Sequence, residues 1–212
     1  MKMQLRKISA IAIMLVLLVF AHSSFAEPVT FANPDVQYDF EIVEHTWNTK
    51  YYHYLGMSIQ NNTADDLDIK VSALFYDISG VPVGVDDTNM YAVEAGGAVF
   101  CTLYTNKEFA TYEYTMTTKK SMYGAVLSSI SYQANTSGNK AIVIAENKGP
   151  TAAKFTKCTV LFLDGGRAVG YADGYLTDSD NELKPGGRQF EEFKCSNKFD
   201  TIEVYFEARA DK

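Results

Sequence analysis

The residues whose chemistry could support catalysis or metal binding are few and widely spaced. Beyond the N-terminal leader, the chain has two histidines, His45 and His53, and three cysteines, Cys101, Cys158 and Cys195. No further His or Cys follows at the spacing of zinc ligands, and no CxxC pair is present. A serine or cysteine nucleophile needs a basic partner, and neither histidine lies in a recognisable catalytic motif. We therefore predict no catalytic residue, no metal site and no cofactor.

One acidic segment has the spacing of a calcium-binding loop. Carboxylates alternate with other residues from Asp178 to Glu182, so that one loop could direct several of them at a cation. A full calcium loop has Gly at its sixth position and Glu at its twelfth, where this chain has Leu183 and Gln189. This mismatch favours the alternative, a solvated acidic hairpin tip.

Two aspartates, Asp77 and Asp164, end apolar runs and are each followed by a glycine-bearing turn. An aspartate in this place accepts hydrogen bonds from the amides of the turn. We predict this structural role for both residues in preference to ligand binding.

The cysteines leave two possibilities open. Cys195 is in phase with Phe193, so Cys158 and Cys195 could both point into one core. A disulfide between them would add about 2–4 kcal/mol to the free energy of unfolding. The alternative is a pair of buried free thiols. Cys101 is in phase with two apolar neighbours and is expected to be a buried thiol.

Aromatic residues are concentrated near the start of the folded region, where Tyr51 and Tyr52 are adjacent. Neighbouring residues of a strand point to opposite faces, so one of these rings is expected to be exposed. An exposed aromatic strip can bind a sugar or a protein partner. We name Tyr51 and Tyr52 as a possible binding face; the alternative is the ordinary preference of aromatic residues for strands.

Residues 1–26 have the pattern of a secretory signal peptide. Basic residues come first, residues 8–21 are almost wholly apolar, and Ser24 and Ala26 supply the small residues of a cleavage site. The rival interpretation, an uncleaved membrane anchor, fits less well because the apolar run is short for a span. Residues 27–35 contain Pro28 and Pro34 and are expected to be a flexible lead-in. We predict a secreted or cell-envelope-associated protein.

The charge of the mature chain excludes some partners. Removing residues 1–26 leaves 16 basic against 26 acidic residues, a net charge of −10. A chain this acidic repels nucleic acid and anionic lipid. No later segment is long and apolar enough to span a membrane.

The pattern that must position these residues is that of β-strands. Apolar residues alternate with polar ones at Leu67, Ile69, Val71, Ala73 and Phe75, and the same alternation recurs from residue 99 to 103 and from 112 to 116. The alternation already starts at residue 36. Helical signal is nearly absent. Residues 121–129, with Gly124 and several β-branched side chains, are expected to form a strand.

The chain uses one pattern twice. Residues 71–87 and 158–173 each contain an apolar run ending in Asp, a glycine-bearing turn and a second apolar run. Further segments match in the same order at an offset of 86 to 90 residues, which indicates an internal repeat. We predict two tandem β-sandwich domains, residues 36–120 and 121–212, each with about seven short strands.

These hairpins resemble the FxLYD family, which are immunoglobulin-like β-sandwich modules of exported bacterial proteins, over most of residues 36–209. The first copy reads Leu74-Phe75-Tyr76-Asp77, Gly80, Gly84, Gly96-Gly97 and Phe100; the second reads Leu161-Phe162-Leu163-Asp164, Gly165, Gly170, Pro185-Gly186 and Phe190. The first copy lacks the proline of the late turn, and the second has Leu163 where tyrosine is usual. The resemblance implies an immunoglobulin-like fold and no catalytic residues.

The predicted function is therefore a non-enzymatic binding or structural role, with an unknown protein or glycan partner at the cell envelope. The competing class is a hydrolase or metal-dependent enzyme with its site at the domain junction, where His45 or His53 would lie beside carboxylates. A third possibility is a homo-oligomer joined through exposed strand edges.

Overall fold

A computed structural model describes residues 39–211. The predicted signal peptide (1–26) and lead-in (27–35) lie outside these residues. The described part of the chain forms antiparallel strands and one short 3₁₀ helix, so the predicted all-β class is confirmed. Between residues 39 and 211 no helix has the length and apolarity that a membrane span requires.

Between residues 39 and 211 the strands form four antiparallel sheets. One sheet has the order β1-β2-β5 and contains β1 (Phe40–Asn48), β2 (His53–Asn61) and β5 (Ala98–Thr105). A second has the order β4-β3-β6 and contains β4 (Pro82–Val93), β3 (Leu67–Tyr76) and β6 (Thr111–Lys120). The third sheet contains β10 (Arg167–Tyr175), β9 (Ala153–Asp164), β13 (Thr201–Arg209) and β11 (Glu182–Leu183). The fourth has the order β12-β8-β7 and contains β12 (Arg188–Lys194), β8 (Lys140–Asn147) and β7 (Ile130–Ser137). In the larger sheet β9 is central and pairs with β10, β11 and β13.

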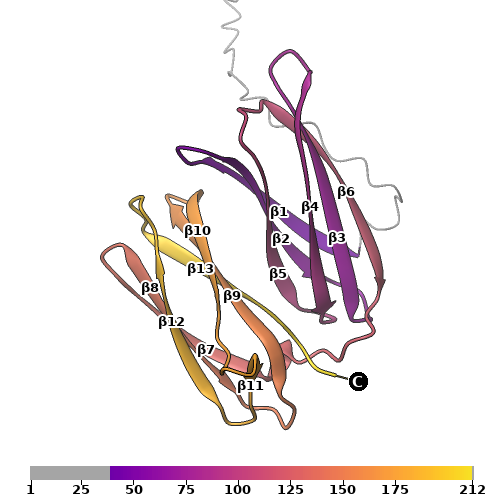
Figure 1. The fold of residues 1–212 in the computed structure, drawn as a ribbon, viewed down its shortest axis with the longest axis vertical. Coiled ribbons are helices and arrows are strands. Elements are labelled where there is room, and N and C mark those ends of the chain that lie inside the picture. Colours follow the sequence, from indigo (N-terminus) through magenta and orange to yellow (C-terminus); the bar gives the residue numbers. More distant parts are fainter. Residues whose placement is uncertain (1–38, 212) are drawn as a thin grey trace, which may run out of the picture.

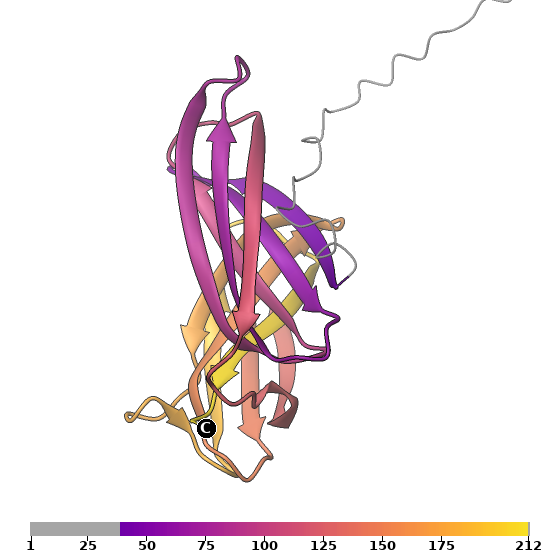
Figure 2. The same cartoon turned by 90° about the vertical axis from the view of Figure 1, so that its right-hand side faces the viewer.

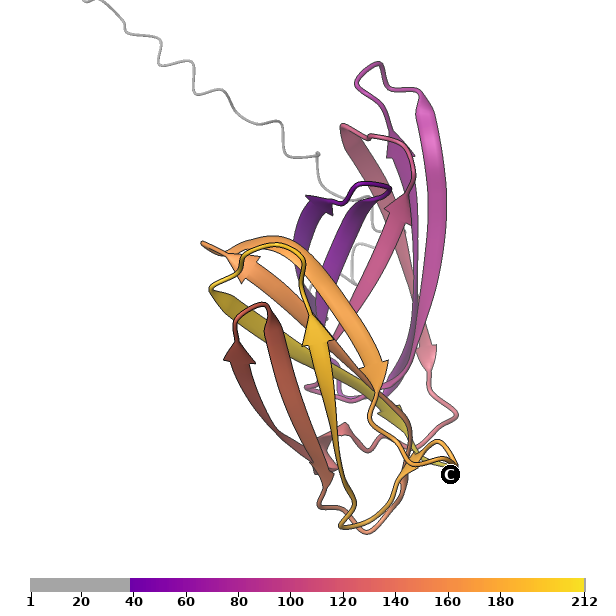
Figure 3. The ribbon, with the colours of Figure 1, turned by 60° about the vertical axis from the view of Figure 1, so that its left-hand side comes forward.

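The four sheets are stacked as layers. We call β4-β3-β6 and β1-β2-β5 the N-terminal sheet pair, and β10-β9-β13 and β12-β8-β7 the C-terminal sheet pair. Figure 1 shows the two pairs side by side, with β1-β2-β5 and β10-β9-β13 as the two inner layers. Figures 2 and 3 show the same two pairs from other sides, with the strands of one pair inclined to those of the other.

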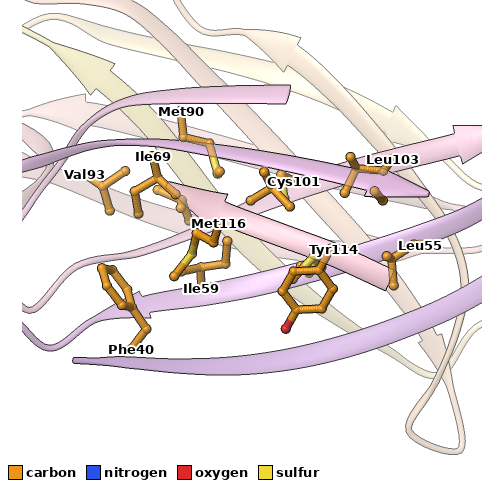
Figure 4. Close-up of a cluster of buried hydrophobic side chains, with 14 of the residues drawn as sticks. Phe40, Leu55, Ile59, Ile69, Met90, Val93, Cys101, Leu103, Tyr114 and Met116 are labelled. Atoms are coloured by element: carbon orange, nitrogen blue, oxygen red, sulfur yellow. The ribbon is translucent and has the colours of Figure 1, made fainter. Parts of the chain in front are cut away.

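The alternation predicted for the first half is confirmed by burial. Val71, Ala73 and Phe75 of β3 point inward, and Val99 and Leu103 of β5 meet them from the facing sheet. Figure 4 shows side chains of β1, β2, β3, β4, β5 and β6 converging in this cluster. Because every second residue of a strand lies on one face, the pattern alone selects which side chains fill the core.

The second half repeats this arrangement. Cys158, Val160 and Phe162 of β9 occupy the phases of the inward residues of β3, and they pack with Val143 of β8 and Phe206 of β13 in a second core cluster. Both clusters are built from the alternate residues of two facing sheets, as in a sandwich.

Two buried asparagines show the repeat at the level of single hydrogen bonds. Asn61 donates its side-chain amide to the carbonyl oxygens of Asp65 (2.9 Å) and Val93 (3.0 Å), and Asn147 donates in the same way to Thr151 (2.8 Å) and Leu183 (2.8 Å). The main chain of each asparagine also exchanges hydrogen bonds with the turn at residues 96–97 or 186–187. The sequence offset of 86 to 90 residues therefore corresponds to equivalent places in the structure.

Two predicted elements differ from the structure. The strand expected over residues 121–129 is wrong, because this segment contains a 3₁₀ helix (Leu127–Ser129) and a single bridge between Gly124 and Ala210. It crosses from one sheet pair to the other, so it has no neighbouring strand to complete a ladder. The first strand runs from Phe40 to Asn48, further along the chain than the start at residue 36 that was predicted; residues 36–38 lie outside the described part.

The buried asparagines generate a prediction about stability. Replacing Asn61 or Asn147 by Ala leaves buried carbonyl oxygens without a donor, so each change should lower the free energy of unfolding by about 1–3 kcal/mol. Asn62→Ala is the matched control, because this side chain is exposed. Denaturant unfolding followed by circular dichroism measures the difference. Equal stability of Asn61→Ala and Asn62→Ala would contradict the assigned role.

Candidate functional site

A third apolar cluster joins the two sheet pairs. Trp47 of β1 and Phe100 of β5 come from the outer face of β1-β2-β5, and Leu161 and Leu163 of β9 and Ala168 of β10 come from the facing sheet. All five are buried, and Trp47 is only 6% exposed. We call these five residues the interface cluster. Both inner sheets are thus covered by apolar side chains on both faces.

Tyrosines surround the interface cluster and orient its rings. Trp47 stacks on Tyr54 with ring centroids 5.1 Å apart, and Tyr171 meets both rings edge-on at 5.7 and 5.6 Å. Phe100 stacks on Tyr205 of β13 at 5.3 Å. Offset or edge-on contacts of this kind stabilise aromatic pairs by about 0.5–1.5 kcal/mol beyond burial. The rings therefore fix how one sheet pair lies on the other.

A glycine allows the rings of Trp47 and Phe100 to pack close to the main chain of β2. Gly56 lies in β2 directly beneath the rings, and a Cβ atom there would be 2.6 Å from Phe100 Cζ and 2.6 Å from Trp47 Cζ3. No side chain fits at those distances without moving a ring. Gly56 is therefore a structural requirement of the interface.

The aromatic packing continues to the surface. Tyr52 lies edge-on to Tyr104 at 5.2 Å and to Tyr54 at 6.2 Å, so its ring extends the group outward from Trp47. Tyr51 is 66% exposed, Tyr52 40% and Tyr104 46%. We call Tyr51, Tyr52 and Tyr104 the aromatic edge.

The predicted binding face is exposed, but for a different reason from the one expected. Tyr51 and Tyr52 lie in the turn before β2 and not in a strand, so the rule of opposite faces does not apply to them. The hydroxyl of Thr49 accepts hydrogen bonds from both of their amides, at 3.4 and 3.1 Å. This turn holds both rings at the surface.

The histidines lie apart from each other. His45 of β1 is half-buried near Phe100, with ring centroids 6.4 Å apart, and burial lowers its pKa below 6.5 while the negative charge of Glu203 opposes this shift. Glu203 also accepts a hydrogen bond from the hydroxyl of Tyr205 at 2.7 Å. His53 instead forms a hydrogen bond with the side-chain oxygen of Asn48 at 2.9 Å. Residues 39–211 contain no group of three or more His, Cys, Asp or Glu side chains that could hold a metal ion.

The two repeated aspartates have different roles. Asp77 accepts hydrogen bonds from the amides of Ser79 (2.8 Å) and Val81 (2.9 Å), as predicted. For Asp164 the prediction is wrong, because the amide of Gly165 donates to Asp200 at 3.0 Å instead. The turn after Asp164 is shorter and uses Gly165 and Gly166 at positive φ, and among residues 39–211 no amide donates to the Asp164 carboxylate.

The carboxylates of the acidic segment have separate partners. Asp178 accepts a hydrogen bond from Gln189, Asp180 pairs with Lys184 at 2.7 Å, and Glu182 lies 3.6 Å from Lys154. The segment forms a turn closed by the main chain of Asp178 and Glu182. The geometry is that of the acidic hairpin tip.

The three cysteines are free and buried, so of the two alternatives the structure has unbonded thiols at Cys158 and Cys195. Both belong to the C-terminal core cluster, as the phase predicted. Cys158 lies opposite Gly174 of β10, whereas Cys195 contacts Gly170 of the same strand. Gly170 and Gly174 are four residues apart, which is roughly 13 Å along a strand. A disulfide needs the sulfur atoms about 2 Å apart. Burial raises the pKa of Cys101 and of Cys158 to about 12.

Sequence reasoning missed the residues of the interface cluster. Two signals were present. Residues 158–163 are an almost unbroken apolar run, which is typical of a strand buried on both faces. In β5, Phe100 occupies the outward phase, where a solvated face would have a polar residue.

Comparisons with known proteins add little to this picture. No protein-family model matches the chain, and no curated protein matches it. Among solved structures, a transglutaminase of red sea bream aligns with 80% of this chain and 29% of its own length, at 10% identity and a TM-score of 0.28. The chain thus spans less than a third of that protein, and a similarity this low supports no functional argument.

The close approach at Gly56 can be tested with one methyl group. Gly56→Ala should lower the free energy of unfolding by about 1–3 kcal/mol, because Phe100 and Trp47 must move. Trp47 is the only tryptophan of the chain, so its fluorescence should shift to longer wavelength as water reaches it. Gly124→Ala is the control, because an added Cβ there meets its nearest atom at 3.4 Å. Unchanged emission and stability in Gly56→Ala would contradict this packing.

The lowered pKa of His45 predicts a pH dependence. The unfolded chain takes up a proton at His45 near pH 6.5 and the folded chain does so only at lower pH, so stability should fall as the pH drops through 6.5. His45→Gln should reduce this loss. Urea unfolding of both proteins at about pH 7.5 and about pH 5.5 measures it. An identical loss in His45→Gln would show that His45 does not contribute.

Proposed function

We propose that the protein is an exported, non-enzymatic binding module made of two tandem immunoglobulin-like sandwiches of the FxLYD type. The matching hydrogen bonds of Asn61 and Asn147 support the duplication. The leader at residues 1–26 supports export, to the cell envelope or outside the cell. The acidic mature chain supports partners other than nucleic acid.

The aromatic edge is the observation that carries the binding proposal. Its three rings are exposed, yet two of them, Tyr52 and Tyr104, pack against each other and against Tyr54, which stacks on Trp47. Exposed rings that are held rigidly lose little conformational entropy on binding, and aromatic residues are enriched where proteins contact partners. The carbon face of a sugar ring or the side chains of a protein partner would fit such a surface.

The residues support an envelope glycan or protein as the ligand of this edge. Lys50 lies over the ring of Tyr51, with its ammonium nitrogen 5.2 Å from the ring centroid, and supplies the only positive charge of the turn at residues 49–52. This combination of a cation and flat rings suits a polar ligand with apolar faces.

The competing function is a hydrolytic enzyme at the junction. Its support is the position of His45, next to Phe100 of the interface and within the influence of Glu203. A general base must reach the group that it deprotonates. In this structure the carboxylate of Glu203 accepts a hydrogen bond from the hydroxyl of Tyr205, which favours a structural role for that pair.

A binding experiment tests the proposal. The double variant Tyr51→Ala/Tyr52→Ala should weaken saturable binding to isolated envelopes of the producing cell by about tenfold or more, because each exposed ring removes contact area. Phe190→Ala, which removes an aromatic residue that is 71% exposed in the C-terminal pair, is the matched control. Glycan arrays and protease-treated envelopes separate the two ligand classes.

Two outcomes would overturn the proposal. One is equal binding by the double variant and the wild type. The other is hydrolysis of a substrate by the wild type that His45→Ala abolishes while circular dichroism remains unchanged; this result would establish the enzyme.

A further inference from the structure

A cavity of about 280 Å³ lies beside the interface cluster, between β4 and β5 of the N-terminal pair and β9 and β13 of the C-terminal pair. This volume is close to the lower end of the range for pockets that bind small molecules, about 300 Å³, so the space suits only a small ligand. The cavity is separate from the aromatic edge, whose residues do not line it.

The lining of the cavity changes from apolar at its base to aromatic at its mouth. Met90 and Phe100 are buried and form the base. Tyr91, Phe155 and Tyr175 are exposed and surround the opening. A planar apolar group could contact rings from both sheet pairs there.

Arg209 is the cation of this wall that lacks a carboxylate partner. Its guanidinium lies over the rings of Tyr123 (4.3 Å), Phe155 (4.7 Å) and Tyr91 (5.3 Å). Among residues 39–211 it forms no ion pair and no side-chain hydrogen bond. Three rings thus pack against the guanidinium, and its N–H groups, which have no carboxylate or carbonyl partner among residues 39–211, remain available for a carboxylate fork.

The two lysines of the cavity already have carboxylate partners. Lys154 pairs with Asp211 and lies 3.6 Å from Glu182, and Lys157 lies 3.3 Å from Asp173 and 3.7 Å from Glu207. Glu207 is the one carboxylate that lines the wall. Burial raises its pKa, with Lys157 opposing the shift. Lys154 and Lys157 thus share four carboxylates, and among residues 39–211 Arg209 is the one cation of the lining without a carboxylate partner.

The backbone at the mouth is strained. Phe155 has φ of 51°, in the left-handed region that residues other than glycine rarely adopt. Its amide donates to the carbonyl of Asn181 at 2.9 Å, and Asn181 also has a positive φ, 62°. In this conformation the ring of Phe155 packs against Arg209 and is 43% exposed. Strain of this kind is concentrated at ligand sites.

We propose that this cavity binds a small aromatic carboxylate. The carboxylate takes the N–H groups of Arg209 in a bidentate contact, and the ring of the ligand packs between Phe155, Tyr175 and the apolar base. The proposal goes beyond the function proposed above and does not depend on it, since neither export nor the aromatic edge enters the argument.

Benzoate is the probe, titrated into the purified protein by calorimetry and by NMR. We expect saturable one-to-one binding that Arg209→Gln weakens at least about tenfold and Arg209→Lys weakens less, because lysine keeps the charge and loses the fork. Arg167→Gln, which removes the same charge from the exposed start of β10, should leave binding unchanged. Tyr175→Ala, which removes an exposed ring, should weaken binding severalfold.

Neutral benzyl alcohol and inorganic phosphate separate the contributions of charge and ring. The proposal requires that both bind more weakly than benzoate. Phosphate binding as strong as that of benzoate would overturn it in favour of a simple anion site. Absence of benzoate binding, or equal binding by wild type and by folded Arg209→Gln, would also overturn it. Thermal melts confirm that each variant is folded.

Discussion

The structure depends on the burial of two inner sheet faces against each other. In an isolated sandwich, the outer face of each sheet meets water, and alternate residues of its strands are polar. Here the outer faces of β1-β2-β5 and β10-β9-β13 have Trp47, Phe100, Leu161 and Leu163 in those phases, and all are buried. Each such side chain contributes about 1.5–3 kcal/mol when it leaves water. The interface cluster therefore joins four layers into one packed unit.

This constraint explains how the two copies of the repeat have diverged. Tyr76 and Leu163 occupy the same place in the repeat, but Tyr76 lies on an outer sheet, where its hydroxyl donates to Glu113 at 2.9 Å, and Leu163 faces Trp47. Leu163 is thus the residue that the interface needs at this place of the repeat. Phe100 and Phe190 are also equivalent, yet Phe100 is 2% exposed and Phe190 is 71% exposed. The two copies have core clusters of the same design, and they differ on the face that meets the other copy.

The same packing creates both candidate surfaces. Twisted sheets that pack face to face diverge at their corners, and the aromatic edge lies at one margin of the contact and the cavity of Arg209 at another. At the aromatic edge, ring contacts continue from the buried Trp47 through Tyr54 to Tyr52 and Tyr104. Charged side chains near the junction, such as Lys157 and Glu207, are paired because an isolated charge could not remain there.

The amino-acid sequence determined the β class, the inward residues and the internal repeat, because all three follow from a period of two residues and from turns at regular spacing. It also located the exposed tyrosines Tyr51 and Tyr52, although their turn was not recognised. The 3₁₀ segment after residue 120, the free state of Cys158 and Cys195 and the hydrogen bonding of Gly165 to Asp200 were decided by distances between segments far apart in the chain. The interface cluster belongs to the same class: alternation tells which residues share a face, but only the tertiary structure decides what covers that face.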